Sequence, residues 1–320
     1  MGMHLLRYLA ARGNYNLTVV DNFFRENKDK EWEELSNQIQ FKMIRGDCTS
    51  SDTFAQLDSD YDYVYLLASV VGVGYTEEMP EEIIRINTSI ILNTLEWMKA
   101  GNNGKLLFTS SSETYAGTVE AFDYKVPTEE TVPLTIVDIT HPRYTYAVTK
   151  MLGEAGVVSY ARAYDFKYTI LRYHNVYGKR MGFKHVIPQV TQRFFDGENP
   201  FKIIGADQSR SFCYINDAIE GTVNAMEKEK ADGEIIHIGM QDEEIRIEEL
   251  VKYIGGIMQF EGDYEVAKAP EGSVSRRSPD ISKARELIGY NPVTGYKKGV
   301  ESTVRWYINY FEEALKTSEH

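Results

Sequence analysis

The sequence predicts an α/β protein built on a doubly wound parallel sheet, with a smaller α/β domain after it. Short β-forming runs alternate with helical stretches in the first half, and the runs are apolar throughout, as in strands covered on both faces. Strands alternating with helices of this length are joined by right-handed crossovers, which makes the sheet parallel. The expected strands cover 16–21, 40–47, 61–69, 105–112 and 167–178, and the expected long helices cover 81–100 and 144–164.

The pattern changes after about Gly178, where turn-rich pieces such as 195–211 and 269–280 appear. Such a region suits a smaller domain that closes over the carboxyl ends of the sheet, where open α/β proteins bind ligands. The tail, 298–316, reads as an amphipathic structural helix.

Composition excludes several functional classes. A net charge of −13 over 320 residues argues against nucleic acid or an anionic membrane as the main partner. The two cysteines cannot form a disulfide framework, no spacing suggests a metal site, and the longest apolar run is too short to span a bilayer. We therefore expect a cytoplasmic, soluble protein without a bound metal, in which any anionic ligand needs a locally basic pocket.

The amino-terminal segment reads as the second half of a dinucleotide-binding βαβ unit. A helix over 3–11 precedes a strand that ends in Asp21, where an acid can bind both ribose hydroxyls of an adenosine. A simple turn role for Asp21 is equally compatible with its position. Asp47 closes the next strand, and either a place near the adenine or a helix-cap role suits it.

Tyr146 and Lys150 form the sharpest candidate pair. They are four residues apart and share one face of the expected helix. An ammonium near a phenol lowers the tyrosine pKa from roughly 10 toward neutrality, which makes a general base for a sugar hydroxyl. Ser111 ends the preceding strand, where its hydroxyl can bind the same oxygen.

These motifs together resemble the extended short-chain dehydrogenase/reductase family of nucleotide-sugar epimerases, dehydratases and decarboxylases. The resemblance covers nearly the whole chain, through "DYVYLLASVVGVGY", "RINTSIILNTLE", "LRYHNVYGKRM", "HVIPQVTQRFFDGENPFKIIGADQSRSFCYINDAIEG", "GEIIHIGMQDEEIRIEEL" and "SRRSPDISKARELIGYNP". It implies a Rossmann-like NAD domain over 1–172 and a nucleotide-sugar domain over 173–320, of which about 213–240 returns to the first. It also implies a homodimer formed through a four-helix bundle, to which each chain gives the helix around 83–99 and the helix that carries Tyr146.

The resemblance assigns roles to individual residues. Ser111, Tyr146 and Lys150 become the catalytic triad, and retained NAD takes hydride from sugar C4 to give a 4-keto intermediate. The residues expected to contact NAD are Gly2, Asp21, Asn22, Asp47, Cys48, Leu67, Ala68, Tyr146, Lys150 and Tyr173. Those expected to bind the nucleotide-diphosphate sugar, with UDP as its nucleotide, are Asn175, His185, Val186, Arg210, Arg276 and Arg277.

The residues after Ser111 bear on the reaction. Ser112 and Glu113 are similar to the pair in UDP-glucuronate decarboxylases, with Arg277 completing that site, whereas dehydratases carry an Asp-Glu pair. We therefore expect decarboxylation of a UDP-hexuronate such as UDP-glucuronate. A C4 or C5 epimerase, with Glu113 as a base at C5, and a binding protein that no longer catalyses remain as alternatives.

The amino terminus departs from the family pattern. Members begin with a strand and G-x-x-G-x-x-G, and Gly2 resembles the third of these glycines. The first strand and two glycines are therefore expected to be missing from this chain. That loss would weaken or abolish NAD binding and leave the neighbouring strands without a ladder partner.

Overall fold

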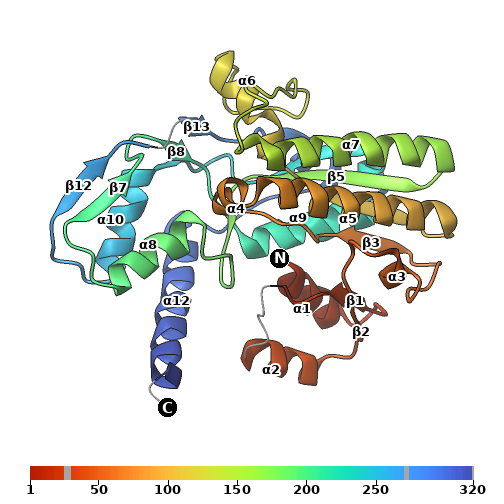
Figure 1. Cartoon of the computed structure of the whole chain (residues 1–320), viewed down its shortest axis with the longest axis horizontal. Helices are drawn as coiled ribbons and strands as arrows, with labels where there is room; N and C mark the ends of the chain where they lie inside the picture. The colour runs from red at the N-terminus through yellow and green to blue at the C-terminus, as the bar shows by residue number, and fades with distance from the viewer. Residues whose placement is uncertain (25–29, 270–273, 319–320) are drawn as a thin grey trace.

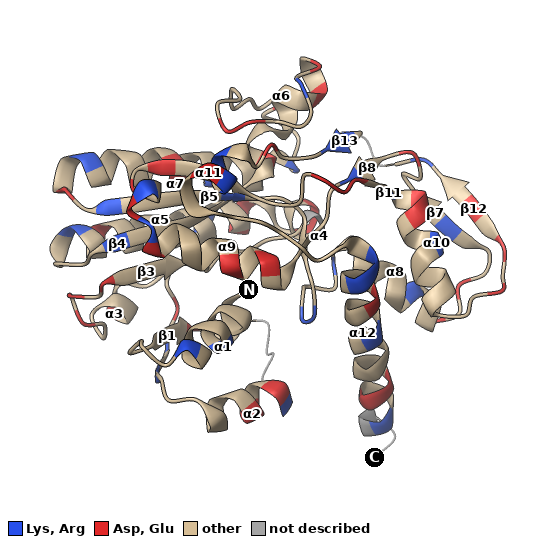
Figure 2. Ribbon diagram, turned by 180° about the vertical axis from the view of Figure 1, so that it is seen from behind, with Lys and Arg blue, Asp and Glu red and all other residues tan. Residues whose placement is uncertain are grey.

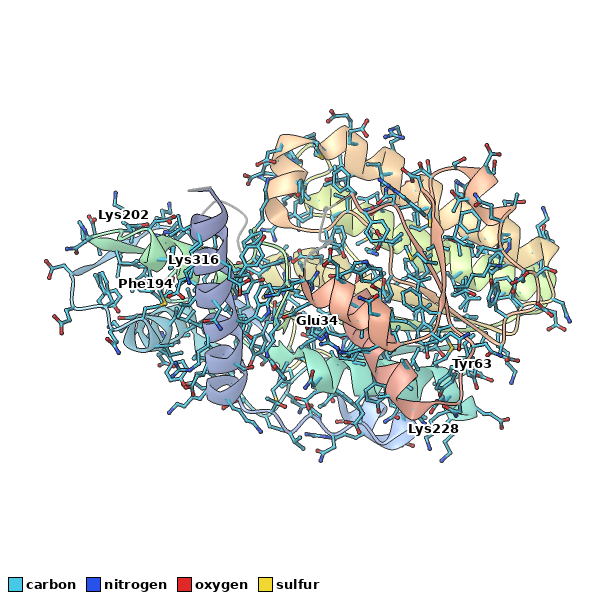
Figure 3. The ribbon with its side chains drawn as sticks, turned by 90° about the horizontal axis from the view of Figure 1, so that it is seen from below. Glu34, Tyr63, Phe194, Lys202, Lys228 and Lys316 are labelled. Atoms are coloured by element: carbon cyan, nitrogen blue, oxygen red, sulfur yellow. The ribbon has the colours of Figure 1, made fainter. Side chains whose placement is uncertain are left out.

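The computed structural model describes residues 1–24, 30–269 and 274–318. Figure 1 shows two lobes, a larger one built around a parallel sheet and a smaller one that carries α8, α10 and α12. Figure 3 looks from below and places Tyr63 and Lys228 toward one end of the molecule and Phe194 and Lys202 at the other. The expected fold class, a doubly wound parallel sheet with a smaller α/β domain, is confirmed, and each of the five expected segments contains a strand.

The main sheet has four strands, all parallel, in the order β10-β5-β4-β3. They span Glu234–Ile238, Lys167–Tyr173, Lys105–Ser111 and Tyr63–Leu66. A separate parallel pair is formed by β1 (Thr18–Asp21) and β2 (Lys42–Arg45). In the described part of the chain no strand pairs with the free edge of β3 or of β1, and both edges line one cavity.

Helices cover both faces of the main sheet, and the two-residue period of the strands decides which face each side chain meets. On β4, Leu106 and Phe108 pack with α5 and α7, whereas Leu107 packs with α9 and α11. The helices of this lobe are α1 (Gly2–Arg12), α2 (Lys30–Gln38), α3 (Ser51–Phe54), α4 (Val73–Glu78), α5 (Pro80–Ala100), α6 (Ala116–Ala121), α7 (Tyr144–Tyr164), α9 (Ile215–Glu227) and α11 (Ser282–Ile288), with short turns η1 (Ser112–Tyr115) and η2 (Glu229–Ala231).

The smaller lobe is an aromatic core between short strands and three helices. Phe194 of α8 stacks on Phe201 of β7 with ring centroids 3.8 Å apart, and Phe260 packs against both. Its elements are α8 (Val186–Phe195), β7 (Phe201–Ile204), β8 (Ser209–Arg210), β11 (Ile245–Arg246), α10 (Ile247–Ile257), β12 (Tyr264–Ala267), β13 (Arg276–Arg277) and α12 (Tyr296–Ser318). The short parallel pair β6 (Val176–Tyr177) and β9 (Cys213–Tyr214) joins the lobes.

Two features of this fold position the site. A Cβ on Gly153 would lie 2.2 Å from Phe108 Cζ, so the missing side chain lets α7 pack closely on β4. In the smaller lobe, β8 lies beside β13 with Arg210 opposite Arg277, and Figure 2 shows basic residues on both strands. The first feature aligns the helix that begins near Tyr146 with the strand that ends at Ser111, and the second brings two arginines together.

Candidate active site

Ser111, Tyr146 and Lys150 meet where β4 ends and α7 begins. The Ser111 hydroxyl accepts a hydrogen bond from the Glu113 backbone N–H at 3.2 Å and also hydrogen-bonds Tyr146. Lys150 Nζ donates to the Thr109 carbonyl at 2.8 Å and lies 5.6 Å from the Tyr146 ring centroid. The two predicted residues on α7 and the predicted serine therefore lie in one place.

The expected low pKa of Tyr146 is wrong for this arrangement. Burial raises the pKa of Tyr146, the Glu113 carboxylate raises it further, and only the hydrogen bond with Ser111 opposes them. Burial also lowers the pKa of Lys150 to about 7, against the attraction of Glu154. Lys150 directs its amine to a backbone carbonyl, and spacing along a helix does not reveal this competing acceptor.

A buried ion pair holds α7, the helix that carries Tyr146 and Lys150, against the main sheet. Arg172 of β5 binds Glu154 of α7 through two hydrogen bonds, 2.9 and 2.7 Å long, and Ser110 donates to the same carboxylate at 2.5 Å. Glu154 and Arg172 are almost fully buried. This bidentate contact fixes α7 against β4 and β5.

Glu113 lies between two arginines from distant parts of the chain. Arg277 Nη1 is 2.5 Å from Glu113 Oε1, and Arg143 Nη2 is 3.6 Å from Glu113 Oε2. Arg277 also donates to Ser112 Oγ at 3.4 Å. Burial alone would raise the pKa of Glu113, but Arg277, together with Arg143 and Arg210, lowers it to about 2. Glu113 is thus a carboxylate at neutral pH.

The residues expected to bind substrate fall into two groups. Asn175, His185, Arg210 and Arg277 line the cavity that contains the catalytic residues. Among the described residues, Arg210 donates to neutral acceptors, namely the carbonyls of Ser209, Val274 and Ser275 and the side chain of Gln208, so these contacts leave its charge available to an anion. Val186 begins α8 and packs against the core of the smaller lobe. Arg276 is exposed and pairs with Glu244 at 2.9 Å. Neither residue is among the described residues that line the cavity.

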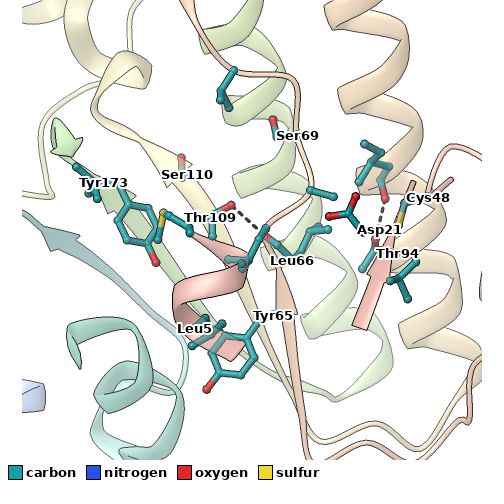
Figure 4. A pocket seen from close by; sticks show the side chains of 18 of the residues that line it. Leu5, Asp21, Cys48, Tyr65, Leu66, Ser69, Thr94, Thr109, Ser110 and Tyr173 are labelled. Carbon is teal, nitrogen blue, oxygen red and sulfur yellow. Dashed lines mark hydrogen bonds between the residues drawn. The ribbon is translucent and has the colours of Figure 1, made fainter. Parts of the chain in front are cut away.

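The residues expected to contact the cofactor all line the same cavity, which has a volume of about 2060 Å³. Figure 4 shows Asp21 and Cys48 on one side of it and Ser110 and Tyr173 on the other. Asp21 Oδ1 accepts from the Phe23 N–H at 2.7 Å, and Asn22 donates to Asp47 at 3.3 Å. The cap of α3 is Ser50 rather than Asp47, which accepts from the Thr49 N–H. The remaining expected residues on this wall are Gly2, Leu67 and Ala68.

Comparison with known proteins decides the family. The family model described as "NAD dependent epimerase/dehydratase family" matches residues 1–239. The chain belongs to this family. It is therefore an NAD-dependent enzyme of the epimerase/dehydratase type, as the sequence predicted, and NAD is its cofactor.

Individual relatives narrow the chemistry to nucleotide sugars. The chain is 31% identical to a UDP-N-acetyl-alpha-D-glucosaminuronate decarboxylase of Bacillus cytotoxicus, over 96% of this chain and 94% of the relative. It is 28% identical to a UDP-glucuronate 4-epimerase of Thermodesulfobacterium geofontis, over 85% and 81% of the two chains. The structure of a point mutant of the UDP-glucuronic acid 4-epimerase of Bacillus cereus, with NAD and a fluorinated UDP-glucuronic acid, matches with a TM-score of 0.84 at 26% identity over 97% and 96%. These relatives support NAD-dependent modification of a nucleotide sugar.

The donor set of the cavity fits NAD. Asp21 holds one carboxylate oxygen on the backbone and makes no hydrogen bond with the other among the described residues, so that oxygen can accept from a ribose hydroxyl. Tyr146 and Lys150 lie at the other end of the same cavity. Within residues 1–24, 30–269 and 274–318, no group of metal-ligating side chains is found, and no helix is long and apolar enough to cross a membrane.

Arg143 is the functional candidate that the sequence reasoning missed. It stands three residues before Tyr146 at the start of α7, lines the cavity and is only 15% exposed. Its signal was its place on the same helical face as Tyr146 and Lys150, since residues three or four apart are neighbours on a helix. Nothing local revealed Glu113 as its partner.

Proposed function

We propose that this enzyme decarboxylates a UDP-hexuronate, such as UDP-glucuronate, through a 4-keto intermediate. The observation that carries the proposal is Glu113, held as a carboxylate by Arg277 and flanked by Arg143, beside Ser111 and Tyr146. An ionised Glu among arginines is suited to a substrate that carries and then loses a carboxylate.

In the proposed reaction the C4 hydroxyl binds between Ser111 and Tyr146. Bound NAD would supply the redox chemistry, as the acceptor and later the donor of the C4 hydride. Tyr146 accepts the hydroxyl proton as a phenolate, which needs the Lys150 amine to turn from Thr109 toward the phenol and carry a proton. Because the pKa of Lys150 is about 7, both of its protonation states are accessible near neutral pH.

The 4-keto hexuronate is a β-keto acid, so its carboxylate leaves as CO₂ while the bonding electrons delocalise into the ketone. The Arg277 guanidinium stabilises the enolate negative charge, and its hydrogen bonds to Glu113 and Ser112 fix its position. A proton from solvent then adds at C5, and Tyr146 gives its proton back to the C4 oxygen when the ketone is reduced again. The net change is loss of CO₂ and uptake of one proton, without net oxidation.

A C4 or C5 epimerase is the second candidate. The similarity to UDP-glucuronate 4-epimerases favours it, since they act on the same sugar class. In a C5 epimerase Glu113 would be the base. Its low pKa disfavours that role, because a carboxylate held by two arginines is a weak proton acceptor.

The test incubates the protein and NAD with UDP-glucuronate or UDP-N-acetylglucosaminuronate, and reads product mass and sugar stereochemistry. We expect a product lighter by CO₂. Unchanged mass with inverted stereochemistry would support the epimerase, and no change with several nucleotide sugars would support a binding protein. Tyr146→Phe should lower kcat about 10²–10⁴-fold through loss of the base. Tyr144→Phe makes the same chemical change outside the cavity lining and should retain full activity.

We also propose that the enzyme pairs through the outer faces of α5 and α7. The two helices pack side by side (Figure 1), and four large apolar side chains on them are at least 43% exposed. These are Ile84, Leu92, Leu152 and Tyr164. Pairing would remove this apolar surface from water.

A further inference from the structure

Arg143 is a charged side chain of the catalytic cavity, and its positive charge is only partly balanced by a carboxylate. Its guanidinium is 3.6 Å from Glu113, beyond hydrogen-bond range, and makes no hydrogen bond to any described residue. Its other contact is the Tyr144 ring, 5.6 Å from the guanidinium carbon to the centroid. A mostly buried guanidinium with free donors has room for a stronger anionic partner.

The other charges facing this region leave an excess of positive charge. Arg277 is committed to Glu113 through a hydrogen bond of 2.5 Å, and Arg210 is held by neutral carbonyls. Glu113 is the carboxylate that contacts Arg143 and Arg277, and the Glu120 carboxylate acts on Arg210 and Arg277, so two carboxylates face three guanidinium groups. Arg277 also keeps a buried Nε that has no hydrogen-bond partner in the part of the chain that the structure describes.

Position along α7 says which part of a substrate Arg143 meets. Arg143, Tyr146 and Lys150 follow one another on one helical face, and Tyr146 hydrogen-bonds Ser111, where the reacting hydroxyl would bind. In a hexuronate the carboxylate is attached to C5, the ring atom next to the reacting C4. With the C4 hydroxyl at Ser111 and Tyr146, a carboxylate on C5 would lie toward Glu113 and the two arginines that contact it.

We propose that Arg143 is the residue that selects acidic over neutral sugars, by leaving Glu113 and binding the hexuronate carboxylate. This deepens the proposed function and rests on it for the choice of substrate class. Arg277 stays on Glu113 during the exchange. A neutral sugar with a hydroxymethyl group at C5 offers Arg143 no charged acceptor, so it gains nothing from the same movement.

The exchange also links substrate binding to Glu113. When Arg143 turns to the substrate, Glu113 loses one of its cationic neighbours and meets a second carboxylate, and both changes raise its affinity for a proton. Glu113 then becomes a better proton carrier for C5 only when an acidic sugar is present. A like-charged neighbour and a lost counter-ion act in the same direction.

The experiment measures equilibrium binding by titration calorimetry, with NAD present, in a Tyr146→Phe background so that turnover does not consume the ligand. UDP-glucuronate and UDP-glucose are compared, since they differ only in the carboxylate. Adding Arg143→Gln should weaken UDP-glucuronate binding about tenfold or more, as for loss of a hydrogen bond to a charged group, and change UDP-glucose binding little. Unchanged UDP-glucose binding also shows that the variant is folded.

Two further variants sharpen the outcome. Arg210→Gln should weaken both ligands alike, as expected of a diphosphate contact, and Arg143→Lys should restore part of the selectivity for UDP-glucuronate. The inference is overturned if Arg143→Gln weakens both ligands equally, weakens neither, or if the parent binds neither. If the wild-type enzyme releases CO₂ but Arg143→Gln keeps the selectivity for UDP-glucuronate, the role of Arg143 is refuted and the decarboxylase proposal stands. Selective binding without release of CO₂ sinks the decarboxylase proposal alone.

Discussion

The charged side chains of the site contact partners that lie far away in the sequence. Glu113 follows β4, Arg143 begins α7 and Arg277 lies in β13, yet the three meet around one carboxylate. Burial raises the pKa of an isolated carboxyl group, whereas here the arginines reverse the direction. The same burial acts on Tyr146, and the neighbouring Lys150 directs its amine to the Thr109 carbonyl instead of the phenol, so the pKa of Tyr146 rises.

The Glu113 ion pair predicts a pH-dependent stability. Its pKa falls from 4.5 to about 2 in the folded protein, so its contribution is complete above about pH 4.5 and is lost as the pH falls toward 2. We expect Glu113→Gln to lower the free energy of unfolding by about 3 kcal/mol at pH 7. The deficit should shrink by about 1 kcal/mol at pH 3.5.

Urea unfolding of both proteins at pH 7, 5 and 3.5 measures this difference. Glu82→Gln is the control, since its ion pair with Arg85 is exposed on α5 and screened by solvent. That control should follow the wild-type pH dependence. A Glu113→Gln deficit that stays constant with pH would contradict the ionised state of Glu113.

At the scale of elements, the contact between β4 and α7 brings the catalytic residues together. Gly153 allows the two to approach, and the Glu154–Arg172 pair locks α7 to β5 beside it. Tyr146 and Lys150 lie on α7 and Ser111 lies on β4, so the spacing between helix and strand sets the distance between the base and the serine.

Gly153→Ala tests this spacing. The added methyl would meet Phe108, which is fully buried and has little room to move, so we expect a loss of about 1–3 kcal/mol in the free energy of unfolding. We also expect lower kcat, because the helix that carries Tyr146 must shift. Gly256→Ala in α10 is the matched control, with no atom near the added methyl. It should be neutral or stabilise by up to about 1 kcal/mol. Equal effects of the two substitutions would show that the α7–β4 contact is not close.

At the scale of the whole molecule, the outer face of α5 and α7 predicts association. The double substitution Leu92→Arg and Leu152→Arg should convert a dimer to a monomer, since each arginine places a charge in the apolar face. Multi-angle light scattering measures the mass. Leu315→Arg is the control, because Leu315 is also exposed but lies on α12. A monomeric wild-type protein would refute this pairing.

The sequence by itself determined the fold class, the order of strands and helices, and the residues that share one helical face, such as Tyr146 and Lys150. These follow from local periodicity, which fixes the side on which each side chain emerges. Family motifs added NAD and the nucleotide-sugar chemistry. Each of these conclusions depends on residues close together in the chain or on the order of short segments.

Tertiary structure alone decided which charges meet. Arg143 and Arg277 converge on Glu113, Glu154 pairs with Arg172, and Lys150 bonds to Thr109, while Arg276 turns away to Glu244. The direction of a pKa shift depends on burial and on every charge within a few ångströms, and both are products of packing between distant segments. That is why spacing placed Tyr146 beside Lys150 correctly and yet gave the wrong sign for its pKa.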